Sequence, residues 1–416
     1  MIRRFCLYGF LKNQKYYEPF LIIAFISYGM NFALIGTLIA FRELAVNLLE
    51  IPSGAIADVF GRRKSMITSF AAYIIFLILM SCGRQVWLLF IAMFFYAIGD
   101  AFRTGTHKAI IFSWLEHEGR SAEKTEVYGL TRSWSKLGSA ASIPIAVTVL
   151  FFSAPNNYSL IFLLCIIPYL INIINFIKYP AYLDGNMRHE QSLLEVCKVT
   201  WRTLKYIATF VPLRRLMLHA MSFEGLFKVT ESYLQPLIKV MVLALPILLY
   251  WNDQQRTAIM IGVVYFVLYL SSSFASRRAA KFVQTLGGGV ATAKCLWMLY
   301  VFSFMLIIFG VIIGLNSLVI GAFIILAIVQ NLWRPMLVSR CAEVADPKEF
   351  ATVLSVESQL KAIFTVIAAP LLGIWVDSLK QTIPQWQFLP VGIIGVILSL
   401  TMLLWLTLNT RHKKIG

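Results

Sequence analysis

Basic side chains stand inside long apolar segments of this chain. Four of them carry more positive charge than the nearby acidic residues obviously neutralise, and they are Arg103, Arg132, Lys136 and Arg334. Arg132 and Lys136 are four residues apart, so a helix would place these like charges on one face. Arginine offers a planar fork of donors suited to carboxylate or phosphate groups. The pattern predicts a cavity for an anionic or zwitterionic metabolite.

Acidic residues in the same segments are candidates for carrying protons, because burial favours the protonated form of a carboxyl group. Glu43 and Glu50 are seven residues apart, two turns along one helix face. The alternative is that each acid pairs permanently with a neighbour such as Arg42. The sequence leaves both open for the four candidates, Glu43, Glu50, Glu224 and Glu231.

Spacing also predicts which charges can satisfy each other. Asp100 and Arg103 are three residues apart, and Glu357 and Lys361 are four apart, so each pair would meet on a helix face. A charge at the centre of a membrane helix costs about 2.5–3.5 kcal/mol on insertion scales. Ion pairs that only lock helices together are therefore an alternative to solute binding. This alternative applies especially to Asp100, Glu224, Lys228 and Glu357.

Composition indicates the environment of these charges. The chain has 416 residues, is 59% hydrophobic and has a mean hydropathy of +0.75, whereas soluble domains are about 45–50% apolar. The excess lies in runs of about 20 residues, the length of a helix that crosses a bilayer. A net charge of +17 would suggest nucleic acid in a soluble protein. Here it fits the basic loops of a polytopic membrane protein, and we expect no nucleic-acid partner.

We predict an all-α integral membrane fold of twelve transmembrane helices. The seventh contains Glu224, Lys228 and Glu231, and its apolar run continues past Pro236, so an interfacial tail is the alternative there. The spans run approximately over 10–30, 34–57, 66–83, 86–112, 128–152, 157–178, 214–240, 256–276, 291–313, 317–340, 351–374 and 388–408.

The loops predict topology and domains. Lysine and arginine accumulate on one side of the twelve spans, which places both termini in the cytoplasm. The basic N-terminus is read as a retained first helix, because no small-residue cleavage site follows it. A long polar segment divides the chain into six spans before and six after. The predicted domains are an N-terminal six-helix bundle, a cytoplasmic linker and a C-terminal six-helix bundle, over 1–180, 181–212 and 213–416.

Six cysteines are scattered singly, so neither a disulfide framework nor a metal site is indicated. We expect no cofactor. No catalytic cluster stands out either, and we do not expect an enzyme.

A short charged loop follows the second span and reads Gly-Ala-Ile-Ala-Asp-Val-Phe-Gly-Arg-Arg-Lys-Ser over residues 54–65. Gly54 lets its helix pack closely against a neighbour, and Gly61 permits a tight turn. Asp58 ends a helix, where its carboxylate opposes the helix dipole and needs an outside partner. Arg62 and Arg63 follow at once. Glu116 and Glu118, in another loop, are candidate partners for this basic cluster.

The spacing Gly-x-x-x-Asp-x-x-Gly-Arg-Arg resembles the signature loop of the major facilitator superfamily of secondary transporters. The resemblance implies two six-helix pseudo-repeat halves, a site near the bilayer midplane between them, and alternating access. It also implies that Asp58 is held by a basic residue and by the start of helix 11, near residues 346–349. In this reading Gly54, Asp58, Gly61, Arg62 and Arg63 form the gating motif.

Departures from the family pattern bear on the substrate. The loop after helix 8, over 276–281, keeps basic residues but has no Asp or Gly, and the segment 138–144 of helix 5 lacks most glycines of drug antiporters. We therefore expect a secondary active transporter, a symporter or an antiporter that is proton-coupled or not, for a small anionic or zwitterionic solute. The alternatives are a proton-driven multidrug exporter and a transporter-like membrane sensor or assembly protein. A monomer in a bacterial inner membrane is expected.

Overall fold

The computed structural model describes residues 1–184, 202, 205–244, 248–345 and 350–411. All regular secondary structure among these residues is helical. Ten helices in this part of the chain are long and apolar enough to cross a membrane. Two interrupted segments, one at the start of each half, complete the expected twelve. The predicted all-α membrane fold is confirmed.

The chain divides into two compact units, each described by itself. Unit 1 comprises Met1–Tyr28 and Phe41–Val199, and unit 2 comprises Gly29–Ala40 and Thr200–Gly416. The predicted division did not anticipate that Gly29–Ala40 belongs with unit 2. Most of the predicted linker 181–212 lies outside the described residues, so the three-part domain division stays a prediction.

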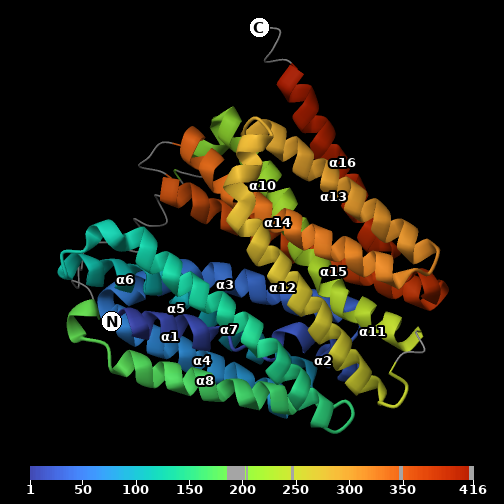
Figure 1. Cartoon of the computed structure of the whole chain (residues 1–416), viewed down its shortest axis with the longest axis horizontal. Helices are drawn as coiled ribbons and strands as arrows, with labels where there is room; N and C mark the ends of the chain where they lie inside the picture. Colours follow the sequence, from blue (N-terminus) through green and yellow to red (C-terminus); the bar gives the residue numbers. More distant parts are fainter. Residues whose placement is uncertain (185–201, 203–204, 245–247, 346–349, 412–416) are drawn as a thin grey trace. The chain divides into compact units, whose positions relative to one another are not determined.

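Unit 1 contains the helices from α1 to η3 (Figure 1). Helix α3 runs through both units, because its first part belongs to unit 2. The bounds are α1 Ile2–Lys12, η1 Glu18–Phe20, α2 Leu21–Ser27, α3 Phe32–Phe60, α4 Arg62–Cys82, α5 Val86–Arg103, α6 Thr106–His117, η2 Ser121–Glu123, α7 Lys124–Phe152, α8 Ser159–Ile177 and η3 Ala181–Asp184.

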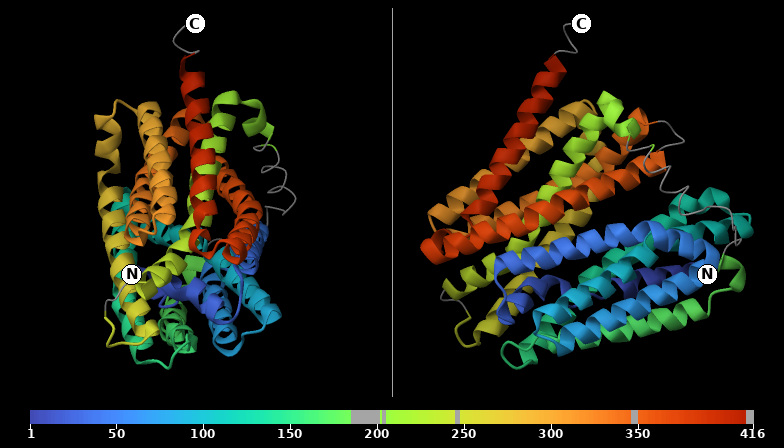
Figure 2. Two further views of the ribbon diagram at one scale, coloured as in Figure 1. Left: turned by 90° about the vertical axis from the view of Figure 1, so that its right-hand side faces the viewer. Right: turned by 180° about the vertical axis from the view of Figure 1, so that it is seen from behind.

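Unit 2 contains the helices from α10 to α16. Figure 2 shows α13 and α16 side by side within it. The bounds are α10 Val211–Thr230, η4 Glu231–Tyr233, α11 Leu234–Ala244, α12 Asp253–Thr285, α13 Gly289–Ile312, α14 Asn316–Val344, α15 Phe350–Thr382, η5 Pro384–Trp386 and α16 Leu389–Arg411.

The first membrane segment of each unit is broken, which corrects the predicted continuous spans 10–30 and 214–240. In unit 1, α1 begins at Ile2 and ends at Lys12, and helix resumes only at Glu18. Polar residues 13–15 interrupt the apolar run, and Pro19 starts the short helix η1. In unit 2, α10 gives way to a 3-10 turn at Glu231–Tyr233 before α11.

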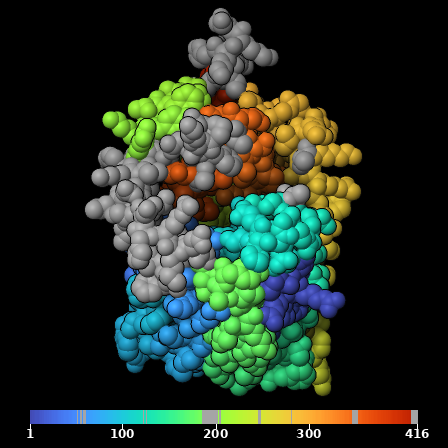
Figure 3. Space-filling model, turned by 90° about the vertical axis from the view of Figure 1, so that its left-hand side faces the viewer, coloured from blue at the N-terminus to red at the C-terminus, as the bar shows by residue number. Residues whose placement is uncertain are grey.

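Helix α1 packs closely on α7 in unit 1. A Cβ at Gly138 of α7 would overlap the carbonyl oxygen of Phe10. Beside this contact, the Gln14 amide donates to the Gly138 carbonyl at 3.1 Å. Figure 3 shows α8 at the surface of unit 1, flanked by α4 and α1, in agreement with their contacts. The absence of a side chain at Gly138 thus allows the backbone of α1 to approach α7 closely.

The first part of α3 is fixed to α15 within unit 2. The Asp377 carboxylate accepts hydrogen bonds from the backbone N–H groups of Phe32 at 3.0 Å and Ala33 at 2.7 Å. These are free donors of the first turn of α3, where the helix dipole also favours a negative charge. This cap explains why Gly29–Ala40 clusters with unit 2.

A glycine pair on α7 tests the packing. We expect Gly138→Ala to lower the free energy of unfolding by about 1–3 kcal/mol, because the new methyl group meets a backbone carbonyl that cannot move aside. Gly129→Ala on the same helix has no atom within 4 Å of the new Cβ, so it should be neutral or stabilise by about 0.5–1 kcal/mol. Thermal unfolding of the two variants in detergent measures this. Equal unfolding midpoints would refute the close α1–α7 contact.

Candidate functional sites in the two units

A hydrogen-bonded charge cluster lies on α4 and α5 in unit 1. Asp100 accepts a hydrogen bond from the Tyr73 hydroxyl at 2.6 Å and one from Nη2 of Arg103 at 2.5 Å. The Arg103 Nε also donates to the Tyr73 hydroxyl, at 3.4 Å. The predicted pairing of Asp100 with Arg103 is confirmed. Because both side chains are about three-quarters buried, this geometry satisfies charges that could not stand alone in an apolar bundle.

A second group of charges gathers around Tyr96 of α5. The Lys15 Nζ, in the break after α1, lies 3.5 Å from the Tyr96 hydroxyl and 3.7 Å from a carboxylate oxygen of Glu18. The Arg42 guanidinium lies 5.2 Å from the Tyr96 ring centroid and pairs with Glu43 at 2.8 Å. The aromatic face and hydroxyl of Tyr96 thus hold two cations in place. The break in the first segment is what brings Lys15 to this position.

Lys12 adds a further positive charge to unit 1. It ends α1 and lies 5.3 Å from the Tyr8 ring centroid. It interacts electrostatically with Arg103, Lys15 and Arg132, which repel it, and with Asp100, which attracts it. No ion pair of Lys12 occurs among the described residues. The described cluster therefore has four cations against three acids, since Lys15, Arg42 and Arg103 each have one acidic partner and Lys12 has none.

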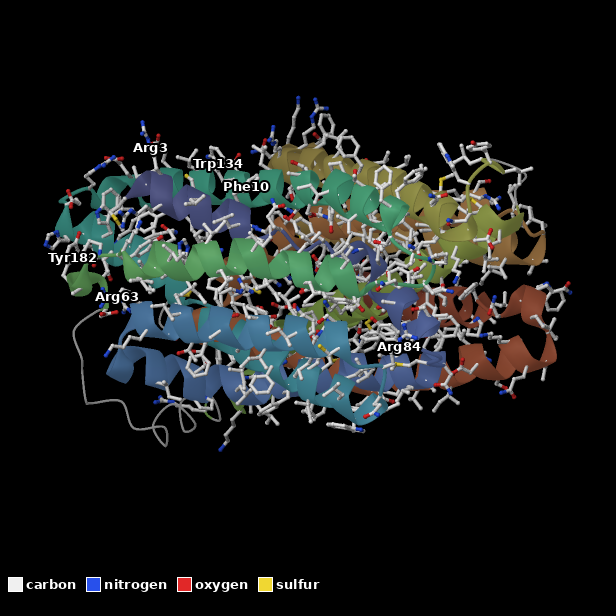
Figure 4. All side chains as sticks on the ribbon, turned by 90° about the horizontal axis from the view of Figure 1, so that it is seen from below. Arg3, Phe10, Arg63, Arg84, Trp134 and Tyr182 are labelled. Atoms are coloured by element: carbon white, nitrogen blue, oxygen red, sulfur yellow. The ribbon has the colours of Figure 1, made fainter. Side chains whose placement is uncertain are left out.

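Arg132 and Lys136 lie on an exposed face of α7 in unit 1. Neither takes part in an ion pair within the described part of the chain. Their charges repel each other, as the spacing predicted. Trp134, between them in sequence, contacts Phe10 edge to face at 6.2 Å (Figure 4). The positive character of unit 1 therefore continues from Lys12 along α7.

Unit 2 holds a different cluster, built from α10, α14 and α15. One nitrogen of Arg334, Nη1, donates to Glu224 at 2.9 Å and to Glu357 at 2.6 Å. Lys361 lies 3.5 Å from the second oxygen of Glu224. A Cβ at Gly225 would lie 2.5 Å from the Phe364 ring, so this glycine lets α10 approach α15. Two acids and two cations balance here.

Two sequence expectations fail in this cluster. Arg334 was expected to carry uncompensated charge, but it pairs with Glu224 and Glu357. Glu357 was expected to pair with Lys361 on its own helix, but it accepts a hydrogen bond from Arg334, and Lys361 lies 3.5 Å from Glu224. Neighbouring helices supply closer partners than the next helical turn does.

An aromatic stack lies beside the unit 2 cluster. Phe223 is stacked between Tyr300, at 3.8 Å, and Trp333, at 4.0 Å, and Trp297 meets it edge to face. The Tyr300 hydroxyl lies 3.2 Å from the Gln330 side chain. Phe223 and Trp333 directly precede Glu224 and Arg334 in sequence. The stack therefore holds the backbone that carries both charged groups.

The remaining proton-carrying candidates lie in less buried or already paired positions. Glu43 is paired with Arg42, and Glu50 is half-buried. Glu231 lies in the break of the seventh segment, is 42% exposed and pairs with Lys228 at 3.8 Å. Of the four predicted acids, Glu224 alone joins the unit 2 cluster just described.

The loop motif is partly described. Gly61 has φ +100°, the left-handed turn expected between α3 and α4. The Arg63 side chain lies 3.3 Å from Asp184 of η3, and its backbone N–H donates to the same carboxylate at 2.9 Å. Figure 4 shows Arg63 and Tyr182 toward one end of unit 1 and Arg84 toward the other. Gly54 lies within α3. The side chain of Asp58 and residues 346–349 lie outside the described part of the chain.

Two basic residues of this motif contact side chains of α6 and η3 within unit 1. Arg62 donates to the Ser113 hydroxyl at 2.7 Å, and Arg63 pairs with Asp184. Glu116, a candidate partner, pairs with Lys124 at 2.6 Å. Asp184 caps the first turn of α4 and binds Arg63 from within unit 1, which the sequence did not indicate because Asp184 is distant in the chain.

Sequence reasoning missed Lys12, Lys15, Tyr73 and Tyr96. The polar triplet Asn-Gln-Lys at 13–15, inside an apolar segment, was a usable signal for a helix break. A broken membrane helix usually lines a binding site in transporters, because its free backbone groups need partners. The two tyrosines have no such signal, since aromatic residues in membrane spans usually pack.

The model of the Major Facilitator Superfamily matches residues 13–358. The chain belongs to this superfamily of transporters. No curated protein matches the sequence.

Solved structures share the fold at low identity. A crystal structure of the nucleoside transporter NupG is 13% identical with a TM-score of 0.73, covering 96% of both chains. A POT family transporter in complex with 5-aminolevulinic acid is 16% identical with a TM-score of 0.71, covering 97% of this chain and 95% of that one. A bacterial homologue of the human lysosomal transporter Spinster is 12% identical with a TM-score of 0.71, covering 99% and 96%.

A double-mutant cycle tests the unit 1 cluster. Arg103→Gln leaves the Asp100 carboxylate without its cation, which should cost about 1–3 kcal/mol. A fully buried pair would cost more, about 3–5 kcal/mol, but both groups are about one-quarter exposed. Adding Asp100→Asn should recover part of the loss, with a coupling energy of about 0.5–3 kcal/mol.

Unfolding in detergent measures the four proteins of this cycle. Glu123→Gln is the control, because it breaks the exposed pair with Arg120 at the start of α7 and should change stability little. Strict additivity of the two cluster substitutions would show that Asp100 and Arg103 do not stabilise each other.

Proposed function

We propose that this protein is a secondary active transporter that moves a small anionic or zwitterionic organic solute by alternating access. The observation that supports it best is the surplus cation Lys12 beside Lys15 and Arg103 at the break of the first segment. In the described part of this cluster each acid already has a cation partner. A carboxylate or phosphate group of a solute would match the remaining positive charge.

The four basic residues chosen from the sequence fit this proposal unequally. Arg103 is fixed by Asp100, and Arg334 by two acids, so we assign them to orienting and balancing a bound solute. Arg132 and Lys136 are exposed on α7 and continue the positive face from Lys12. They are suited to attracting an anion before it reaches the cluster.

The setting of the protein is part of the same proposal. The matched superfamily and the apolar helices make it an integral membrane protein. The basic loops support cytoplasmic termini, and we propose a monomer in a bacterial inner membrane. Proton coupling is proposed as well, with Glu43, Glu50, Glu224 and Glu231 as the candidates chosen from the sequence.

Ligand binding to Lys12→Met tests the solute class. The purified protein is screened by thermal shift against organic anions, amino acids, sugars, nucleosides and lipophilic cations. A ligand at 100 times its Kd stabilises the folded state by about 2.7 kcal/mol. We expect an anion or zwitterion to stabilise the native chain and the effect to fall at least tenfold in apparent affinity in Lys12→Met.

The matched control is Lys108→Met, which removes an exposed lysine over the rings of Phe112 and Tyr128 in the same unit. It should bind like the native chain. Stabilisation by lipophilic cations alone would favour the multidrug exporter instead. Binding without uptake into proteoliposomes would favour the sensor or assembly protein.

Asp58→Asn tests the gating motif. The substitution keeps the size of the side chain and removes the charge that opposes the dipole of its own helix. We expect slower uptake of the solute that the screen identifies, with unchanged membrane insertion. Asp253→Asn, on an acid that is 71% exposed at the start of α12, is the control. Uptake at the native rate by Asp58→Asn would remove Asp58 from the gate.

A further inference from the structure

Glu357 is the most deeply buried acid of the unit 2 cluster. Its side chain is completely buried, and Oε2 accepts a hydrogen bond from Nη1 of Arg334 at 2.6 Å. Its other oxygen, Oε1, is also buried and has no hydrogen-bond partner among the described residues. A buried carboxylate oxygen without a donor is costly, because water has been removed and nothing replaces it.

Glu224 has the opposite arrangement in the same cluster. Its Oε1 lies 2.9 Å from Arg334 and its Oε2 lies 3.5 Å from Lys361. Both oxygens are therefore matched by positive charge. Of the four carboxylate oxygens of Glu224 and Glu357, only Oε1 of Glu357 lacks a hydrogen-bond partner or a nearby cation among the described residues. A proton on this oxygen would remove a locally unmatched negative charge from the apolar interior.

The charged groups that face Glu357 determine how its protonation would change the net charge of the cluster. Arg334 and Cys341 come from α14, Glu224 from α10 and Lys361 from α15 itself. Tyr300 of α13 lies near Glu224. With Glu224 and Glu357 ionised, the two acids balance Arg334 and Lys361. A proton on Glu357 leaves one positive charge unmatched.

We propose that Glu357 is a proton-binding site that takes up one proton on Oε1 and thereby makes the Arg334 cluster attract one negative charge of a solute. No covalent bond other than the new O–H forms. Nη1 of Arg334 keeps its hydrogen bond to Glu224, and the guanidinium, whose side chain is 43% exposed, gains capacity for an anion. The link to a solute rests on the proposed transport function, whereas proton binding does not.

Linkage makes the two events reciprocal. A proton that strengthens anion binding is itself bound more tightly once the anion is present. The unit 2 cluster would then carry a proton and a negative charge together. This assignment differs from the four acids chosen from sequence, which did not include Glu357.

Infrared difference spectra between low and high pH test the proton site without any solute. A protonated carboxyl group gives a carbonyl stretching band that the ionised form lacks. We expect the purified native chain to show a titrating band from a buried carboxyl, and Glu357→Gln to lose it. Asp253→Asn, which removes an acid that is 71% exposed at the start of α12, should retain the band. Glu357→Asp keeps an acid and should retain a shifted band.

Each outcome decides the proposal. Loss of the band in Glu357→Gln with retention in Asp253→Asn supports the proposal. The proposal is overturned if the native chain shows no titrating band or if the band persists in Glu357→Gln. It is also overturned if Glu224→Gln loses the band while Glu357→Gln keeps it. If Glu357→Gln does not fold, the shift in Glu357→Asp decides instead, and an unshifted band overturns the proposal.

A second measurement addresses the link to the solute. An anion found by thermal shift is added to unbuffered protein, and proton uptake is followed with an indicator dye. Uptake by the native chain that disappears in Glu357→Gln supports the coupling. Anion binding without proton uptake refutes the coupling but leaves the proposed transport function standing. A titrating band from Glu357 without any anion ligand leaves the proton site standing but refutes the proposed anionic solute.

Discussion

The structure depends on one constraint, the cost of placing charge among apolar helices. Arg334 shows how the chain meets it, because a single guanidinium nitrogen reaches two carboxylates from two other helices. Such a contact requires three helices at short range, and Gly225 allows it by bringing α10 close to α15. Charge pairing and helix packing are therefore the same requirement in unit 2.

Unit 1 meets that constraint in another way. Its first segment is interrupted, so that Lys15 reaches Tyr96 and Lys12 ends a helix instead of crossing the apolar interior. Hydroxyl and ring groups of tyrosine share the task with acids. The result is a cluster with four cations against three acids, whereas the unit 2 cluster is balanced. This difference is the basis on which we propose that unit 1 attracts an anion.

The fold was predictable because long apolar runs and basic loops are strong signals that do not depend on exact contacts. The pairing of Asp100 with Arg103 was predictable for a similar reason, since both lie on one helix turn. The pairing of Glu357 with Lys361 was wrong because a sequence shows distance along one helix only. The ion-pair partner of Glu357 is Arg334, which lies on another helix at 2.6 Å. The same limit hid Asp184 as the partner of Arg63.

The break in the first segment of unit 1 was missed because an apolar average conceals three polar residues at 13–15. Weighing each polar residue against the backbone donors it could satisfy would have found this break. Its position argues for function over mere packing. A helix that served only to span the bilayer would gain from continuity, since every interrupted turn leaves backbone groups to be satisfied elsewhere. Unit 1 accepts that cost between α1 and η1, beside its charge cluster, which is where a solute-binding protein would need shaped polar space.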